Sequence, residues 1–172
     1  SRVVADSRQL HPNWNDDDHL LNILVDNAKR FPDHVAMRER DRGVWQEYTW
    51  SRYLDDVLCF AAGLETRGVK PEDVVLVIGD NRPALYLSML GAITLRAIPS
   101  PAYPDTRPEE LAGQIQRENI RFAVAEDQEQ VDKLMHVCEA HGCTLQLIVY
   151  DDPRGLENTD QTMAFTRLIE IG

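Results

Sequence analysis

Apolar residues recur along this chain with two spacings, which predict where helices and strands form. Helical spacing over residues 20–28 and 54–64 predicts two amphipathic helices. Between them, residues 35–39 and 44–48 flank a glycine-containing turn at residues 41–43, which predicts a β-hairpin. The first part of the chain is therefore expected to be helix, hairpin, helix.

After the hairpin, short apolar runs alternate with amphipathic segments. The run at residues 74–78 has strand length and is continuously apolar, which is typical of a sheet covered on both faces. The runs lie at residues 74–78, 97–98, 121–125 and 145–150, with a proline-rich loop expected at residues 99–105 and a final amphipathic segment at residues 165–171. We therefore predict an α/β fold, with a mostly parallel twisted sheet and helices on both faces, preceded by a helix and a β-hairpin.

Several residues predict where the helices begin and end. Thr49 is the expected N-cap of the helix after the hairpin, and Gly68 is its expected left-handed end. Asn81 is the expected cap of the helix that follows residues 74–78. Thr106 and Glu109 have the spacing of a capping box. The acidic and amide-rich residues 126–133 are the expected start of a helix over residues 127–140.

The domain organisation follows from the same pattern. Residues 1–15 are polar, contain Pro12 and Trp14, and are interpreted as an extended lead-in. The acidic residues 16–18 have the charge that a helix N-terminus favours. Because no repeat or low-complexity linker interrupts them, residues 16–172 are expected to form one α/β unit.

Composition limits the classes of function. The chain has 172 residues, of which 43% are hydrophobic and 27% charged, as in an ordinary globular protein. A net charge of -11 argues against nucleic acid as a partner and against an anchor on anionic lipid. The chain lacks the apolar run of about 20 residues that spans a bilayer. Three cysteines favour a reducing, cytoplasmic setting over a disulfide framework.

The turn at residues 79–81 is the first candidate for nucleotide binding, because parallel sheets bind ligands beyond the carboxyl ends of their strands. Gly79 is followed by Asp80, which would place a carboxylate where a phosphate should bind. The glycine spacing also differs from both common phosphate-binding motifs. A structural role for this turn is therefore the favoured interpretation.

Four soft-metal ligands lie close together, at His136, Cys138, His141 and Cys143. On a predicted helix, His136 and Cys138 point to different sides, and Cys138 continues the apolar series of the helix. His141 precedes a glycine, as is common at a helix end. The favoured interpretation is a core cysteine and a helix terminus, and no metal ligand is assigned.

The remaining candidates are acidic pairs and aromatic residues. Adjacent side chains on a helix diverge, so the acidic pairs are interpreted as surface charge, although carboxylate catalysis by residues distant in sequence stays open. The aromatic cluster is interpreted as a hairpin packing on the next helix, with a ligand shelf as the alternative. These residues are Asp55 and Asp56, Glu109 and Glu110, Asp151 and Asp152, then Trp45, Tyr48, Trp50 and Tyr53. No catalytic, cofactor-binding or metal-binding residue is assigned.

An ordered series of short motifs resembles the N-terminal region of the adenylate-forming, AMP-binding superfamily, and within it the long-chain fatty-acid–CoA ligases. The motifs lie at residues 31–33 with Ala36, residues 48–50, 68–69, 73–74, 79–83 and 103–105, and most specifically residues 126–134 and 148–156. Three positions depart from the pattern: Glu72 where relatives usually carry glycine, Ala84 where glutamate often follows, and Arg96 where a small residue is usual. These departures concern turns and surface.

The resemblance implies an enzyme that uses ATP, Mg²⁺ and coenzyme A to convert a fatty acid into its thioester. The family's phosphate-binding loop has no counterpart in this sequence, so the chain is expected to be truncated before that loop and inactive alone. Its expected partners are the remainder of the synthetase and the fatty acid, ATP and CoA substrates. The resemblance also makes a homodimer plausible. The whole enzyme is expected in the cytoplasm, with the surface of the inner membrane as an alternative location.

Two alternatives remain open at this stage. The first alternative is a stand-alone binding or regulatory module of the same ancestry, and the second is an unrelated Rossmann-like or flavodoxin-like nucleotide binder. A partial doubly wound sheet is also expected to leave an unpaired edge or apolar face, which predicts self-association.

Overall fold

The computed structural model describes residues 20–172. The expected lead-in at residues 1–15 and the expected acidic helix start at residues 16–18 lie outside the described residues. The helices are α1 Leu20–Arg30, α2 Trp50–Thr66, α3 Pro83–Thr94, α4 Pro108–Arg117, α5 Gln128–His141 and α6 Phe165–Ile171. The strands are β1 Val35–Asp41, β2 Val44–Thr49, β3 Val74–Ile78, β4 Ile98–Ala102, β5 Phe122–Ala125, β6 Leu147–Tyr150 and β7 Thr162–Ala164.

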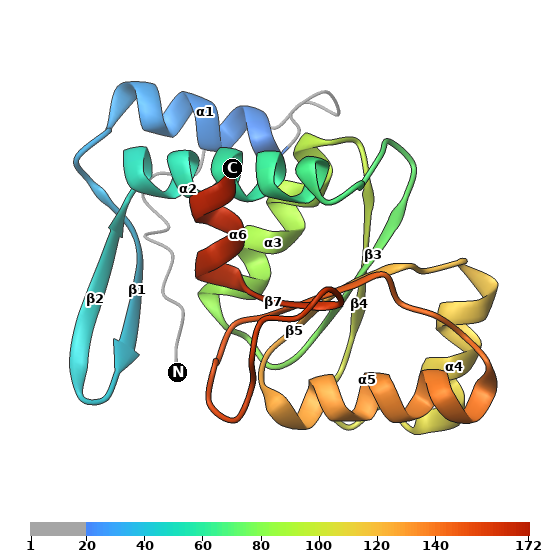
Figure 1. The fold of residues 1–172 in the computed structure, drawn as a ribbon. Coiled ribbons are helices and arrows are strands. Elements are labelled where there is room, and N and C mark those ends of the chain that lie inside the picture. The colour runs from blue at the N-terminus through green and yellow to red at the C-terminus, as the bar shows by residue number, and fades with distance from the viewer. Residues whose placement is uncertain (1–19) are drawn as a thin grey trace.

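The main sheet has five strands in the order β4-β3-β5-β6-β7, and all four pairings are parallel. The antiparallel hairpin of β1 and β2 forms a separate two-stranded sheet, which projects to one side in Figure 1. The predicted fold class is therefore confirmed, including the helix and the hairpin that precede the sheet.

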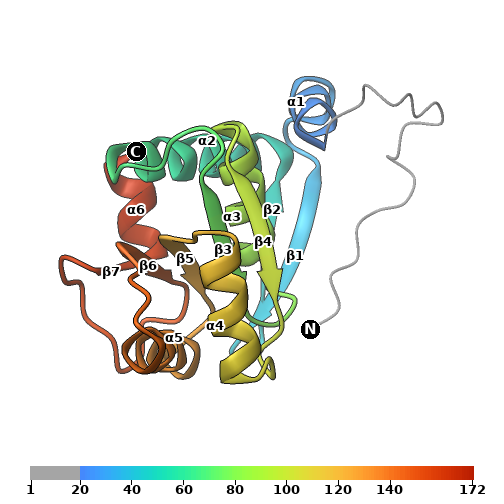
Figure 2. The same ribbon diagram turned by 90° about the vertical axis from the view of Figure 1, so that its right-hand side faces the viewer.

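Helices cover both faces of this sheet, because successive residues of each strand point to opposite sides. Val75, Val77 and Phe122 face a core completed by α2, α3 and α6. Their neighbours Leu76 and Ile78 face a second core, completed by α4 and α5. Figure 2 shows α4 and α5 gathered on one side of the sheet, opposite α2, α3 and α6.

Two of the helix signals act as predicted, and two do not. The Thr49 side chain accepts a hydrogen bond from the Arg52 backbone N–H at 3.2 Å, so it caps α2. Gly68, with φ of 97°, lies in the left-handed region directly after the end of α2. Asn81 does not cap α3. Its Oδ1 accepts from the Tyr86 hydroxyl at 2.9 Å, while Arg82 occupies the N-cap position. The capping box is also absent, because α4 begins at Pro108, after the sequence Thr106-Arg107.

β4 is longer than predicted and runs through Pro99 and Pro101, which the sequence analysis placed in a loop. The Ile98 N–H donates to the Asp73 carbonyl at 2.8 Å, so the N–H groups at alternate positions of β4 point toward β3. The two prolines have the opposite orientation, at the outer edge of the sheet. An edge strand loses no ladder hydrogen bond there, which is why prolines are tolerated.

Two further differences arise from short or strained segments. The loop predicted after Asp151 contains β7, a three-residue strand paired with β6. Glu72 and Arg96 have left-handed φ of 71° and 59°. The Glu72 N–H donates to the Arg96 carbonyl at 2.9 Å. This hydrogen bond joins the two left-handed residues, which lie just before β3 and β4, although a left-handed conformation is unfavourable for residues other than glycine.

Replacing Asp127 with alanine is expected to lower the free energy of unfolding by about 1 kcal/mol, because the side chain caps α5. Its Oδ1 accepts a hydrogen bond from the Gln130 backbone N–H at 3.2 Å. Urea unfolding followed by circular dichroism measures the loss. Asp132→Ala, an exposed position on the same helix, is the matched control. Equal losses in both variants would assign the effect to negative charge near the helix start instead of the cap.

Candidate functional site

Three loops meet at the carboxyl edge of the sheet, the place where parallel sheets bind ligands. β3, β5 and β6 end at Ile78, Ala125 and Tyr150, and charged residues follow each of them. Because β5 pairs with both β3 and β6, the residues after these ends lie side by side. This edge is therefore the candidate functional site.

An ion-pair network joins the three loops. Arg82 Nε lies 3.1 Å from Glu126 Oε1, and Arg82 Nη1 lies 3.1 Å from Asp151 Oδ2. The other oxygen of Glu126, Oε2, accepts the backbone N–H of Asp80 at 2.8 Å. One arginine thus joins carboxylates that follow two different strands, and Glu126 also secures the turn after β3.

Gly79 is required by close approach. A Cβ atom on Gly79 would lie 2.7 Å from Glu126 Cβ and 2.6 Å from Leu85 Cδ1, closer than atoms can pack. The glycine therefore admits the Glu126 side chain, whose carboxylate takes the Asp80 N–H that a phosphate would need. The arrangement ties loops together and does not fit a triphosphate.

The same network does not fit Mg²⁺. That ion prefers carboxylate oxygens with room for several waters, whereas Glu126 and Asp151 are committed to Arg82. Across residues 20–172, no group of three or more histidine, cysteine, aspartate or glutamate side chains is placed to hold a metal ion. The carboxylates at this edge therefore hold its loops together through Arg82.

Burial and neighbouring charges shift the pKa of Asp151 at this edge and the pKa of Tyr48 in the hairpin. Desolvation raises the pKa of Asp151 above its usual value, although Arg82 opposes the shift, and Asp152 and Glu126 add to it. Burial also raises the pKa of Tyr48, with a further contribution from the carboxylates of Glu39 and Asp151. The hairpin residue Tyr48 therefore experiences the field of the loop after β6.

Asp151→Asn is expected to become more stable relative to the wild type as pH rises from about 4 to 7. An acid whose pKa is raised on folding favours the folded state when protonated, and that contribution is lost as pH rises through the folded pKa. Asparagine keeps the shape without the charge. Urea unfolding at several pH values measures the difference, which should vanish at the acid end, below the usual value of 3.8.

Arg82→Gln should act in the opposite direction, because it removes the cation that lowers the pKa of Asp151. Its loss of stability should grow over the same pH range. A pH-independent difference for Asp151→Asn would contradict a partly buried, partly uncompensated carboxylate at this position.

The four possible soft-metal ligands, for which a structural role is the favoured interpretation, separate into two exposed histidines and two paired cysteines. His136 and His141 are exposed, whereas Cys138 and Cys143 are partly exposed with their sulfur atoms 3.0 Å apart. Cys138 packs against the core formed with α4 and α5. Gly142, with φ of 69°, ends α5 as the sequence indicates.

The acidic pairs also separate. Asp55 is exposed, while Asp56 Oδ2 lies 3.9 Å from Arg52 Nε. Asp151 and Asp152 pair with different arginines, Arg82 and Arg154. Hydrogen bonds from Arg154 lower the pKa of Asp152 to about 2.

Glu109 and Glu110 are exposed at the start of α4, where Glu110 pairs with Arg107. Among the aromatic residues, Tyr53 is buried and Trp50 packs against the core, as the predicted hairpin packing requires. Trp45 does not follow that prediction, since it is 59% exposed.

Sequence reasoning missed the Arg82–Glu126–Asp151 network. It treated Glu126 as part of a helix start and Asp151 as half of an acidic pair, and it did not consider Arg82. A signal was present, because each residue comes within four positions of the end of a predicted parallel strand. Only the strand order, however, brings those ends together.

The chain is a parallel α/β unit in which ion pairs of Arg82 with Glu126 and Asp151 join the loops at the carboxyl edge of the sheet. The family model for AMP-binding enzymes matches residues 24–167. The chain belongs to the AMP-binding enzyme family, which confirms the predicted resemblance.

Related proteins in this family include several CoA ligases. The chain is 29% identical over 133 residues to 4-hydroxybutyrate–CoA ligase 2 of Metallosphaera sedula, covering 77% of this chain and 23% of that protein. It is 22% identical over 153 residues to a long-chain-fatty-acid–CoA ligase of Rattus norvegicus, covering 89% of this chain and 23% of that protein. It therefore spans about a quarter of the length of these curated relatives.

A solved structure shows the same fold. Acetoacetyl-CoA synthetase from Streptomyces lividans superposes with a TM-score of 0.74 at 20% identity, covering 85% of this chain and 24% of that one. Within residues 20–172, none of the helices combines the length and the apolar character needed to cross a membrane.

Proposed function

We propose that this chain is an N-terminal α/β subdomain of a larger ATP-dependent acid–CoA ligase that activates a fatty acid. The match to the AMP-binding family over residues 24–167 carries the proposal. The rat relative, named as a long-chain-fatty-acid–CoA ligase, supports the fatty acid, and the Metallosphaera relative supports a shorter hydroxy acid as the main competing substrate.

In the proposed reaction, the carboxylate attacks the α-phosphate of ATP, pyrophosphate leaves, and the CoA thiol then displaces AMP. Both first reactants are anions, so the chemistry requires cations and phosphate-binding N–H groups. At the carboxyl edge, Glu126 already occupies the Asp80 N–H, and Arg82 is paired with two carboxylates. The chain therefore contributes a scaffold, and the proposed phosphate-binding loop belongs to the remainder of the enzyme.

The test compares the 172-residue chain with the product of the longest open reading frame that contains it. Pyrophosphate exchange is measured with ATP, Mg²⁺ and either palmitate or 4-hydroxybutyrate. We expect exchange from the longer protein with palmitate and none from the 172-residue chain. Exchange with 4-hydroxybutyrate alone would replace the fatty acid in the proposal, and robust exchange by the 172-residue chain would contradict the scaffold role.

The stand-alone module of the same ancestry remains the second candidate. A stop codon directly after the codon for Gly172 would favour it, while an open reading frame that continues into a phosphate-binding loop would exclude it. The family match decides against an unrelated Rossmann-like or flavodoxin-like nucleotide binder.

We further propose that the remainder of the synthetase, or a second copy, packs on this chain, and that the enzyme is cytoplasmic, with the inner membrane surface as an option. At the β4 edge, Ile98 is 52% exposed, and the nearby Tyr103 is 78% exposed. Light scattering of the 172-residue chain should therefore show concentration-dependent self-association, which Ile98→Lys should weaken. A clean monomer at high concentration would contradict the self-association.

A further inference from the structure

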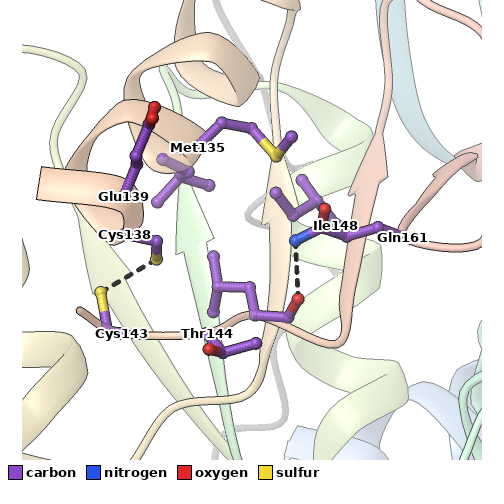
Figure 3. Close-up of a pocket in the computed structure, with 9 residues that line it drawn as sticks. Met135, Cys138, Glu139, Cys143, Thr144, Ile148 and Gln161 are labelled. Atoms are coloured by element: carbon purple, nitrogen blue, oxygen red, sulfur yellow. Dashed lines mark hydrogen bonds between the residues drawn. The ribbon is translucent and has the colours of Figure 1, made fainter.

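The end of α5 brings two cysteines together. Gly142 adopts a left-handed conformation, and the Cys143 backbone N–H donates to the Cys138 carbonyl at 3.1 Å. This hydrogen bond reverses the chain over the last turn of the helix. The Cys143 side chain returns to the helix, and its sulfur lies 3.0 Å from that of Cys138 (Figure 3).

The separation is close to what a covalent bond requires. A disulfide has sulfur atoms about 2.05 Å apart, so an approach of about 1 Å converts this contact into a bond. Such a shift is within the reach of side-chain rotations, because the backbone between the two residues is already reversed. The third cysteine, Cys59, is on α2, which covers the opposite face of the sheet, and does not take part.

Reagents can reach the pair. Both cysteines are partly exposed and line a cavity of about 260 Å³ between α5, the start of β6 and the residues before β7. In Figure 3, the two sulfur atoms point toward one another at one end of the lining, with Thr144 beside Cys143. The hydrogen bond from Gln161 Nε2 to the Leu145 carbonyl, at 2.8 Å, holds the neighbouring wall.

We propose that Cys138 and Cys143 form a reversible dithiol–disulfide site, oxidised by small disulfides of the oxidised-glutathione class. This site is independent of the proposed ligase activity. The sulfur of Cys143, as thiolate, attacks the external disulfide, forms a mixed disulfide and releases one thiolate. Cys138 then attacks the Cys143 sulfur, its proton passes to the second leaving thiolate, and the internal bond forms. Two electrons pass from the chain to the external disulfide, which becomes two thiols.

The two cysteines have different roles in this sequence. Burial, followed by the hydrogen bond to Cys143, raises the pKa of Cys138 to about 12. A protonated thiol is a poor nucleophile, so the first attack belongs to Cys143 and the resolving step to Cys138. Once formed, the bond fixes the C-terminal end of α5 to the segment that leads into β6.

The test treats the reduced 172-residue chain with oxidised glutathione at neutral pH and follows it by acid quenching, alkylation and mass spectrometry. We expect a product lighter by two hydrogen atoms, in which Cys59 alone remains alkylatable and a proteolytic fragment contains both Cys138 and Cys143. This product should form at least about tenfold faster than any glutathione adduct of Cys59. The Cys59→Ser variant should behave as the wild type.

Single variants separate the roles of the two cysteines. Cys138→Ser should accumulate a glutathione adduct at Cys143. Cys143→Ser should form its adduct at Cys138 more slowly, because burial, the largest cause of the raised pKa of Cys138, remains in that variant. Circular dichroism confirms that the variants are folded. Stable glutathione adducts in the wild type without the internal bond, three unchanged thiols, or a bond that includes Cys59 would each overturn the proposal.

Discussion

Phe60→Ala is expected to lower the free energy of unfolding by about 4 kcal/mol, the largest effect of any substitution considered for this chain. Phe60 is fully buried in α2, and its ring stacks on that of Phe165 in α6 with centroids 5.0 Å apart. It also lies directly beneath Gly91 of α3, where an added Cβ would meet its ring at 2.6 Å. Removing the ring therefore leaves a cavity between three helices, none of which can close it alone.

Urea unfolding followed by far-ultraviolet circular dichroism measures this loss, with Leu58→Ala as the matched control. Leu58 is on the same helix but is 48% exposed, so its truncation should cost less than about 1 kcal/mol. Phe60→Leu keeps most of the volume and should fall between the two. Similar losses for Phe60→Ala and Leu58→Ala would contradict the burial of Phe60 between α2, α3 and α6.

Gly63→Ala is expected to lower the free energy of unfolding by about 2 kcal/mol, even though alanine favours a helix. A Cβ atom on Gly63 would lie 2.8 Å from Leu168 Cγ and would also press on the Leu168 backbone carbonyl of α6. Backbone atoms cannot move aside as a flexible side chain can, so α2 and α6 must separate. Overpacking should lower the free energy of unfolding by about 3 kcal/mol, and the higher helix propensity of alanine should raise it by about 1 kcal/mol.

Gly113→Ala in α4 is the matched control for this prediction. The new Cβ would meet only Nη1 of Arg117, at 2.9 Å, which is the far end of a flexible side chain. This variant should therefore gain roughly 0.5–1 kcal/mol from helix propensity. Thermal unfolding of the two variants should shift in opposite directions. Stabilisation of both would refute the close approach of α2 and α6.

The sequence anticipated the site only in part. It identified residues 126–133 as the start of a helix, and Asp127 does cap α5. It did not indicate that Glu126, one position earlier, lies across the sheet against Gly79 and Arg82. Caps depend on residues within one helical turn, whereas this contact joins positions more than 40 residues apart. Only the pairing of β3 with β5 determines it.

The sulfur pair shows the same limit over a much shorter distance. The spacing of Cys138 and Cys143 is local, and Gly142 marked the helix end correctly. Helical geometry alone nevertheless assigned Cys138 to the core and left Cys143 without a partner. The left-handed turn at Gly142 turns the following residue back, and that reversal decides the contact.

By itself, the sequence determined the parallel α/β class, the hairpin and the order of the described helices and strands other than β7, and its ordered motifs indicated the AMP-binding family. Hydrophobic periodicity suffices for the helices and strands, because it acts between neighbouring residues. The tertiary structure alone decided that β4 is an edge strand able to contain two prolines, that three residues after Gln161 form a fifth strand, and that Arg82 neutralises carboxylates from two other loops. Each of these depends on which strands become neighbours, and that choice is made by burial of both faces of the sheet at once.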